Sequence, residues 1–473
     1  MLRSRQLAFA STVARAPARG RPDLWIFLAI PLGLLAGASV ARGAAPLIVA
    51  AVVSVVVLAW AVRRPELLLI AWFLAILANG RWLTYHQVGP LYVTEPLLAL
   101  LALAVVMRFV LGSDDADPAG RKRALRFLAI LLLVMLVPAL VGVLVQTADL
   151  DLLSARNTLL ILYALFAFIA AYVTDLGRTY RAWFFAVLGG SALALLLVLA
   201  GQAGDGVATS TGAVRIASHT FLLAFGIAPL MLAAASREGL VKPVVAIACA
   251  LPFLVSLILV NHRSAWLAFA AAAAVVFARR LTAPVIVGTV AILVCGFVLM
   301  TSTVAQSALL GQELARAKTV TSTSDPNARY RLDFWKAVLA KSIDSPLFGA
   351  GFDPYPASVV PRSTVDPETD LPAPHNSFVA IAYRIGFIPF LVVLVLLGDL
   401  VRRGFQASIV RTDPRDRAVC SALTAIVVYV GAASAFNVFL EAPYAGPLFW
   451  TAVGLLAYAV YADPFRARGL ATA

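Results

Sequence analysis

The sequence predicts an all-α, polytopic integral membrane protein, on grounds of composition and of pattern. Of its 473 residues, 62% are hydrophobic and only 13% are charged, whereas a soluble domain carries about 25% charged residues. The apolar runs are long enough to cross about 30 Å of hydrocarbon, which takes roughly 20 helical residues. They lack the alternation of apolar and polar residues that is typical of strands, so we expect helical spans.

We interpret the apolar segments as about 12–14 transmembrane helices that flank one large extracytoplasmic loop with a short helix of its own. The predicted parts are a basic cytoplasmic tail, transmembrane helices 1–11, the extracytoplasmic loop, transmembrane helices 12–14 and a second cytoplasmic tail. Their ranges are 1–22, 23–303, 304–375, 376–462 and 463–473.

The distribution of arginine and lysine predicts which side of the membrane each loop faces. With the N-terminus inside, the basic clusters, among them Arg63–Arg64, 121–126 and 402–417, all fall on the same side, as the positive-inside rule requires. We therefore expect both termini in the cytoplasm and the loop 304–375 on the opposite side of the membrane. The net charge of +14 then indicates an anionic lipid surface and not nucleic acid, because no basic stripe alternates with aromatic residues.

Cysteines and acidic residues give no sign of a metal site. Cys249, Cys295 and Cys420 lie in apolar runs without a CxxC spacing, which argues against a disulfide framework and against a zinc site. The acidic residues expected on the outer face form no close Asp-x-Asp pair, and a hard cation needs several convergent oxygens. We therefore expect no metal and no other cofactor.

The long loop contains one segment with helical periodicity, Ala328–Ile343. Its apolar residues Phe334, Trp335, Val338 and Leu339 share one side, and the helix is expected to end near Ser345–Pro346. Gly349 and Gly351 would permit a tight turn directly afterwards.

Polar residues gather where the predicted spans meet the outer surface. The candidates are Arg215, His219, His262, Arg263, Arg329, Arg331, Trp335, His375 and Asn376. A guanidinium group presents a planar fork of donors that matches phosphate oxygens and keeps its proton, and a neutral histidine can take a proton from a hydroxyl group. Each residue also has a simpler interpretation: an arginine that reaches the headgroups, a packed histidine, an N-cap at Asn376, or an Arg329–Asp333 pair one turn apart.

Four short motifs follow one another over about 130 residues. They are Asn261-His262-Arg263-Ser264, Arg331-Leu332-Asp333-Phe334-Trp335, Pro346-Leu347-Phe348-Gly349-Ala350-Gly351 and the His375-Asn376 pair before an apolar span. In this order they resemble the signature region of the bacterial O-antigen ligase and polymerase family of membrane glycosyltransferases. One departure is Tyr383-Arg384-Ile385-Gly386, where the family has an acidic residue before the glycine.

The resemblance implies a GT-C-like enzyme with its active site outside the cytoplasmic membrane. The donor would be an undecaprenyl-diphosphate-linked glycan, the acceptor a saccharide or glycolipid, and no metal would be needed. Arg263, Arg331 and Arg215 would hold the diphosphate, and His375 would be the base or would orient the acceptor.

Other functions remain open at this point. Within the family, a polymerase would extend repeat units on the carrier lipid, and a protein glycosylase is a third possibility. A transporter or flippase of a lipid-linked or anionic substrate would need ionisable residues along a mid-bilayer path and two related halves. A metal-dependent transferase would need convergent carboxylates.

Overall fold

The structure is a computed structural model that describes residues 87–88, 91–92, 94–110, 118–146, 161–172, 176–199, 206–208, 214–216, 219–259, 263–278, 326–351, 355 and 374–461. The chain divides into two compact units, 1–63 and 64–473, and every described residue belongs to the second. The predicted tails 1–22 and 463–473, Cys295 and most of the loop 304–375 lie outside the described residues.

The described residues are predominantly helical, as the sequence predicts. Their twelve helices are α4 (Thr94–Val110), α5 (Pro118–Gln146), α7 (Leu165–Ala171), α8 (Leu176–Leu199), α9 (His219–Arg237), α10 (Pro243–Leu259), α11 (Arg263–Phe277), α14 (Pro326–Asp344), α15 (Ser377–Ile385), α16 (Phe387–Val410), α17 (Pro414–Ser434) and α18 (Ala445–Tyr461). Two antiparallel hairpins accompany them, which the sequence analysis did not predict. They pair β1 (Gln87–Val88) with β2 (Leu91–Tyr92) and β3 (Gly206–Ala208) with β4 (Val214–Ile216).

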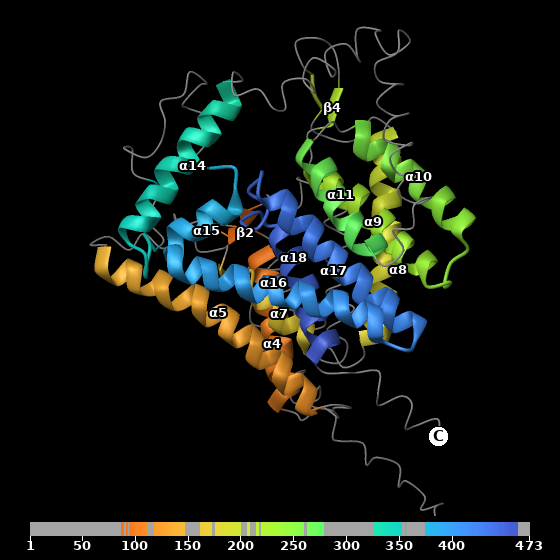
Figure 1. The fold of residues 1–473 in the computed structure, drawn as a ribbon, viewed down its shortest axis with the longest axis horizontal. Helices are drawn as coiled ribbons and strands as arrows, with labels where there is room; N and C mark the ends of the chain where they lie inside the picture. Colours follow the sequence, from red (N-terminus) through yellow and green to blue (C-terminus); the bar gives the residue numbers. More distant parts are fainter. Residues whose placement is uncertain are drawn as a thin grey trace, which may run out of the picture. The chain divides into compact units, whose positions relative to one another are not determined.

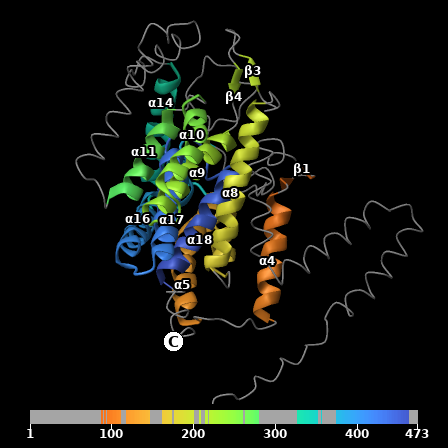
Figure 2. The ribbon, with the colours of Figure 1, turned by 90° about the vertical axis from the view of Figure 1, so that its right-hand side faces the viewer.

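Helix α17 forms the centre of the bundle. It packs against α9, α11, α16 and α18, while α18 also packs against α5 and α7. Figures 1 and 2 show α17 and α18 between the α9–α11 group and the α5–α16 pair. Fifteen residues of α18, from Ala445 to Ala459, are buried. The core therefore lies along α17 and α18.

Among the described residues, two helices have the length and composition of membrane spans. Ala119–Leu144 and Pro414–Ser434 are long and apolar enough to cross a membrane. Shorter apolar helices are Leu98–Met107, Trp183–Leu196, Leu223–Arg237, Pro243–Leu257, Ser264–Phe277 and Ala445–Tyr461. Large apolar side chains on α5, among them Ile130, Leu133, Val137, Leu140 and Leu144, are exposed. Such a surface suits lipid and not water, whereas the number of crossings and their orientation stay predictions.

The first of the transmembrane helices predicted within 376–462 consists of two helices, α15 and α16. They meet at Gly386, whose φ of +87° favours glycine. A Cβ atom at Gly386 would lie 2.7 Å from the carbonyl oxygen of Pro346. The close approach of this turn explains a break that the sequence analysis did not predict.

The predicted loop helix is present as α14, one turn longer than its periodic segment. It ends at Asp344, directly before the predicted stop at Ser345–Pro346. The predicted turn is confirmed as well, since Gly349 and Gly351 adopt φ values of +57° and +61°.

Candidate functional site

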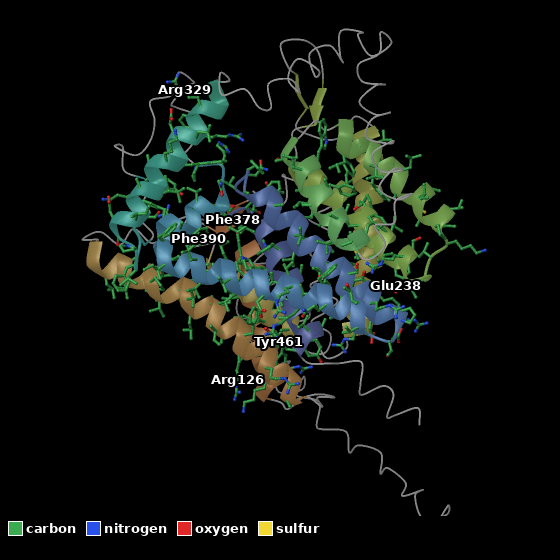
Figure 3. The ribbon with its side chains drawn as sticks, viewed as in Figure 1. Arg126, Glu238, Arg329, Phe378, Phe390 and Tyr461 are labelled. Atoms are coloured by element: carbon green, nitrogen blue, oxygen red, sulfur yellow. The ribbon has the colours of Figure 1, made fainter. Side chains whose placement is uncertain are left out.

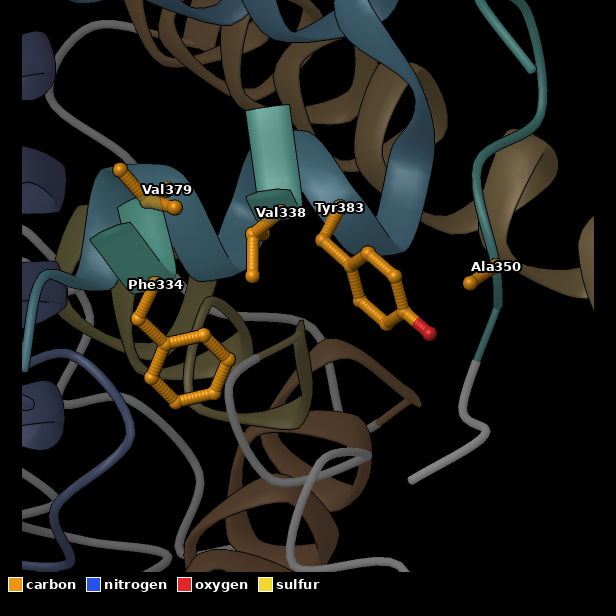
Figure 4. Close-up of a cluster of buried hydrophobic side chains, with 5 residues drawn as sticks. All are labelled: Phe334, Val338, Ala350, Val379 and Tyr383. Carbon is orange, nitrogen blue, oxygen red and sulfur yellow. The ribbon is translucent and has the colours of Figure 1, made fainter. Parts of the chain in front are cut away.

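The apolar side of α14 fixes this helix on α15. Phe334 and Val338 are fully buried and form a cluster with Ala350 of the following turn and with Val379 and Tyr383 of α15. Figure 4 shows these five side chains. Burying a side chain of this size stabilises the packing by about 1.5–3 kcal/mol. The predicted apolar side is thus confirmed, and α14 is held in place by the residues that follow His375.

The turn after α14 caps the C-terminal end of α15. The backbone N–H groups of Ala350 and Gly351 donate to the carbonyl oxygens of Tyr383 and Arg384, at 2.7 and 3.0 Å. These carbonyls would otherwise lack partners at a helix end. A Cβ atom at Gly349 would lie 2.5 Å from the backbone nitrogen of Gly386. The glycines of the motif therefore allow backbone to pack on backbone.

The His375–Asn376 pair begins α15. The side chain of Asn376 accepts hydrogen bonds from the backbone N–H groups of Phe378 and Val379, at 3.0 and 3.2 Å, so its simpler interpretation as an N-cap is confirmed. His375 has a φ of +49°, a left-handed conformation that is rare for residues other than glycine. Holding it costs about 1–3 kcal/mol, and such strain often accompanies function. The structure thus commits His375 to one backbone geometry.

Residues 435–444, between α17 and α18, join the start of α15 to the start of α11. We call them the junction loop. Asn437 donates from its side-chain nitrogen to the hydroxyl of Ser264, at 3.0 Å, and its carbonyl accepts from the backbone N–H of Ser377, at 3.3 Å. Ser264 follows Arg263, the first residue of α11. The junction loop therefore holds the Arg263 and His375 positions in one framework.

Arg331 and Trp335 of α14 face the same framework. A guanidinium nitrogen of Arg331 lies 3.5 Å from the carbonyl oxygen of Phe436 in the junction loop. The indole N–H of Trp335 donates to the carbonyl oxygen of Pro374, the residue before His375. Two of the predicted α14 residues thus contact the segments that carry the predicted histidine.

Arg329 is different. Its side chain is 80% exposed and lies 3.9 Å from the carboxylate of Asp333, one turn along the helix. Figure 3 shows it near the end of α14 that is remote from α15. The simpler interpretation of an intrahelical ion pair is confirmed, and Arg329 is not among the residues brought to the junction loop.

The structure places the backbone of three further candidates. Arg215 lies in β4 opposite Val207 of β3, His219 is the first residue of α9, and Arg263 is the first residue of α11. His262 lies outside the described residues. Helices α9 and α11 both pack on α17, which the junction loop follows. His219 and Arg263 therefore belong to the same bundle as the junction loop.

The sequence analysis missed a polar cluster at the first residue of α15, Ser377. The hydroxyl of Ser377 lies 3.1 Å from a carboxylate oxygen of Glu441 and accepts from the backbone N–H of Leu440, also at 3.1 Å. Glu441 is one of the acidic residues expected on the outer face, where the sequence shows no close Asp-x-Asp pair. Its position between two apolar spans was the available signal, but its partner lies 64 residues earlier.

Arg384 completes this cluster on the α15 side. It is 2% exposed, donates to the carbonyl oxygen of Gly351 at 3.3 Å, and lies 5.0 and 5.2 Å from the ring centres of Tyr355 and Tyr383. Burial among these rings favours cation–π contacts. The Tyr-Arg-Ile-Gly departure from the family pattern therefore has a structural counterpart, a buried cation near Glu441.

The electrostatics of the cluster favour a proton on Glu441. Burial raises the pKa of Glu441 from its ordinary 4.5 to about 7, against the opposing effects of the Ser377 hydrogen bond and of Arg384. Burial likewise raises the pKa of Tyr355, so its hydroxyl stays protonated. Among the described residues, no three His, Cys, Asp or Glu side chains come together as metal ligands. The cluster can therefore hold and release a proton near neutral pH.

Comparison with known families now gives this arrangement a context. Residues 247–394 match the family model described as O-antigen ligase (Wzy_C). The matched segment includes Arg263, Arg331, Trp335, His375 and Asn376, and it ends before the junction loop. A comparison with curated proteins finds no match to this chain. The resemblance seen in the four motifs is confirmed over this segment, which is similar to the O-antigen ligase family, whose ligases and polymerases are membrane glycosyltransferases.

Proposed function

Given an O-antigen ligase domain over residues 247–394, we propose that the protein transfers a glycan from an undecaprenyl-diphosphate carrier to a saccharide or glycolipid acceptor. The observation that carries the proposal is the meeting of motif residues at the junction loop. Arg331 contacts this loop, Trp335 contacts the residue before His375, and Asn437 links the start of α15 to Ser264 beside Arg263.

The roles of the arginines follow from the charge that develops in the reaction. As the bond between the sugar and the diphosphate breaks, negative charge grows on the departing phosphate oxygens. Arg331, Arg263 and Arg215 would stabilise this charge through paired N–H donors. Their charge does not depend on pH in the physiological range, so this stabilisation needs no metal.

His375 and Asn376 serve the acceptor side. His375 would take the proton of the acceptor hydroxyl or would orient this hydroxyl for attack. Asn376 caps α15 and so fixes the backbone next to the histidine. His219, His262 and Arg329 were candidates for substrate binding, and for Arg329 the exposed pair with Asp333 favours a structural role instead.

The proposed location is the bacterial cytoplasmic membrane, with both termini inside and the site outside. The support is the distribution of basic clusters, which favours this orientation. Labelling of single cysteines tests it: one introduced within 354–374 should react in intact cells, whereas one within 402–417 should react only after permeabilisation. The reverse pattern would contradict the orientation.

The decisive test uses the purified protein in proteoliposomes with a radiolabelled undecaprenyl-diphosphate glycan, with and without EDTA. Products that appear only when an acceptor is added would indicate a ligase, and a ladder of longer carrier-linked products a polymerase. If the label crosses the bilayer and no new glycosidic bond forms, the protein would be a transporter and not a glycosyltransferase.

Single variants test the site itself. Arg263→Ala, Arg331→Ala and His375→Ala should each lower transfer at least 100-fold while the protein stays inserted. Lys336→Ala is the matched control, because Lys336 is an exposed cation on the same helix as Arg331. Near-normal transfer by the Arg331 and His375 variants would contradict the proposed site.

A further inference from the structure

The junction loop brings a carboxyl group to the start of α15. Glu441 lies outside the helices α17 and α18 and keeps partial exposure. Its carboxylate lies 3.1 Å from the hydroxyl of Ser377, two residues after His375. Within the chain, this acid is therefore a neighbour of the motif histidine, although it follows the matched family segment.

The surroundings of Ser377 satisfy Glu441 in both of its protonation states. When Glu441 is ionised, the Ser377 hydroxyl can donate to the carboxylate. When Glu441 is protonated, its O–H can donate to Ser377, whose own hydrogen can then turn to the carbonyl oxygen of Asn437, 3.2 Å away. The second lone pair of Ser377 accepts from the backbone N–H of Leu440. A proton can thus arrive or leave without stranding a buried polar group.

The charged and titratable groups around Glu441 also suit a change of protonation. Arg384 of α15 and the hydrogen bond from Ser377 favour the carboxylate, whereas burial favours the protonated acid. On α14, Arg331 contacts the same loop at Phe436. Burial has the largest effect and raises the pKa of Glu441 to about 7, which is where a general base works best at neutral pH.

We propose that Glu441 is the proton acceptor of the site, and that His375 orients the acceptor hydroxyl. This inference rests on the proposed glycosyl transfer. The acceptor oxygen forms a bond to the anomeric carbon, and the bond from this carbon to the diphosphate oxygen breaks with its electron pair. The proton of the acceptor hydroxyl passes to the Glu441 carboxylate and later to water. No oxidant, reductant or further reactant is required.

Transfer rates measured against pH in proteoliposomes test the proposal. Wild-type transfer should rise as pH increases through about 7, since Glu441 must be ionised to accept a proton. Glu441→Gln keeps a side-chain oxygen for Ser377, yet should lower transfer at least 100-fold and leave a residual rate that no longer rises with pH. His375→Gln should keep the rise in its residual rate. Asp333→Asn, an exposed acid on α14, is the control and should match the wild type.

The outcomes are distinct. A Glu441→Gln rate within about threefold of wild type, or a residual rate that still rises through pH 7, would overturn the role of Glu441. If the residual rate of His375→Gln no longer rises with pH, the proton acceptor would be His375 and not Glu441. If the wild type makes no product from the carrier-linked glycan at any pH, the proposed function itself fails. The melting temperature in detergent then still shows whether Glu441 titrates, because its pH dependence should differ between wild type and Glu441→Gln.

Discussion

Two glutamates of this protein, Glu238 and Glu441, have contrasting surroundings. Glu238, after α9, is ion-paired with Arg237 and Arg417, so that one carboxylate joins the ends of α9 and α17. Glu441 is instead held by a serine hydroxyl, with Arg384 near enough to act on it through space. The two guanidinium contacts of Glu238 form a crosslink between two helices. The Ser377 hydroxyl can both donate and accept a hydrogen bond, so Glu441 can be protonated or ionised. Low exposure alone therefore does not distinguish a structural carboxylate from one that takes part in proton transfer. The hydrogen-bonding and ion-pair partners of the carboxylate make this distinction.

The largest expected effect is on the Glu238 side. Glu238→Ala removes the carboxylate that pairs with two guanidinium groups, those of Arg237, 3% exposed, and Arg417, 22% exposed. Breaking a buried ion pair costs about 3–5 kcal/mol. We expect a clear fall in the melting temperature in detergent, with little change in transfer per folded molecule. Asp399→Ala is the control, because its pairs with Arg402 and Arg403 are more exposed and worth about 0–1 kcal/mol. Equal losses of melting temperature in Glu238→Ala and Asp399→Ala would contradict the structural role of Glu238.

A smaller effect is expected at the turn that supports the Glu441 side. Gly349→Ala adds a Cβ atom that would meet the backbone of Gly386 and Tyr383 at 2.5 Å, at a φ of +57°. The strained conformation alone costs about 1–3 kcal/mol, so both the melting temperature and transfer should fall. Gly398→Ala has open space around it and should be neutral or slightly stabilising, as alanine is in helices. Unchanged transfer by Gly349→Ala would show that α15 keeps its position without this turn.

The smallest effect sharpens the comparison most. Ser377→Ala removes a hydrogen bond that lowers the pKa of Glu441, so this pKa should rise and the rise in transfer should move to higher pH. Leu440 also loses the partner of its N–H, at a cost of about 1–3 kcal/mol. Ser342→Ala removes a hydroxyl that bonds to the carbonyl oxygen of Val338 on its own helix α14, and it should leave the pH dependence unchanged. A Ser377→Ala profile identical to wild type would separate Ser377 from the titrating group.

The sign of the stability change with pH follows from the same pKa. Between 4.5 and about 7 the folded protein keeps on Glu441 a proton that the unfolded chain has released. The contribution of protonated Glu441 to the free energy of unfolding is therefore fully present below pH 4.5 and is lost as pH rises through about 7. Wild type should accordingly lose more melting temperature over this range than Glu441→Gln does.

Local features of the site could be predicted from the sequence. The α14 helix, the glycine turn, the Asn376 cap and the Arg329–Asp333 pair all depend on residues within a few positions of one another. The break at Gly386 could not be predicted, because its cause is the distant carbonyl of Pro346. The same holds for the Ser377–Glu441 contact, which no periodicity encodes.

The glycine packing has a consequence for protein engineering. A Cβ atom at Gly142 of α5 would lie 2.7 Å from the carbonyl oxygen of Phe348, and one at Gly351 would lie 2.7 Å from the backbone nitrogen of Val143. Here α5 and the turn touch through main chain, so no choice of side chain can relieve the contact. A mutant library aimed at new acceptors should therefore keep these glycines.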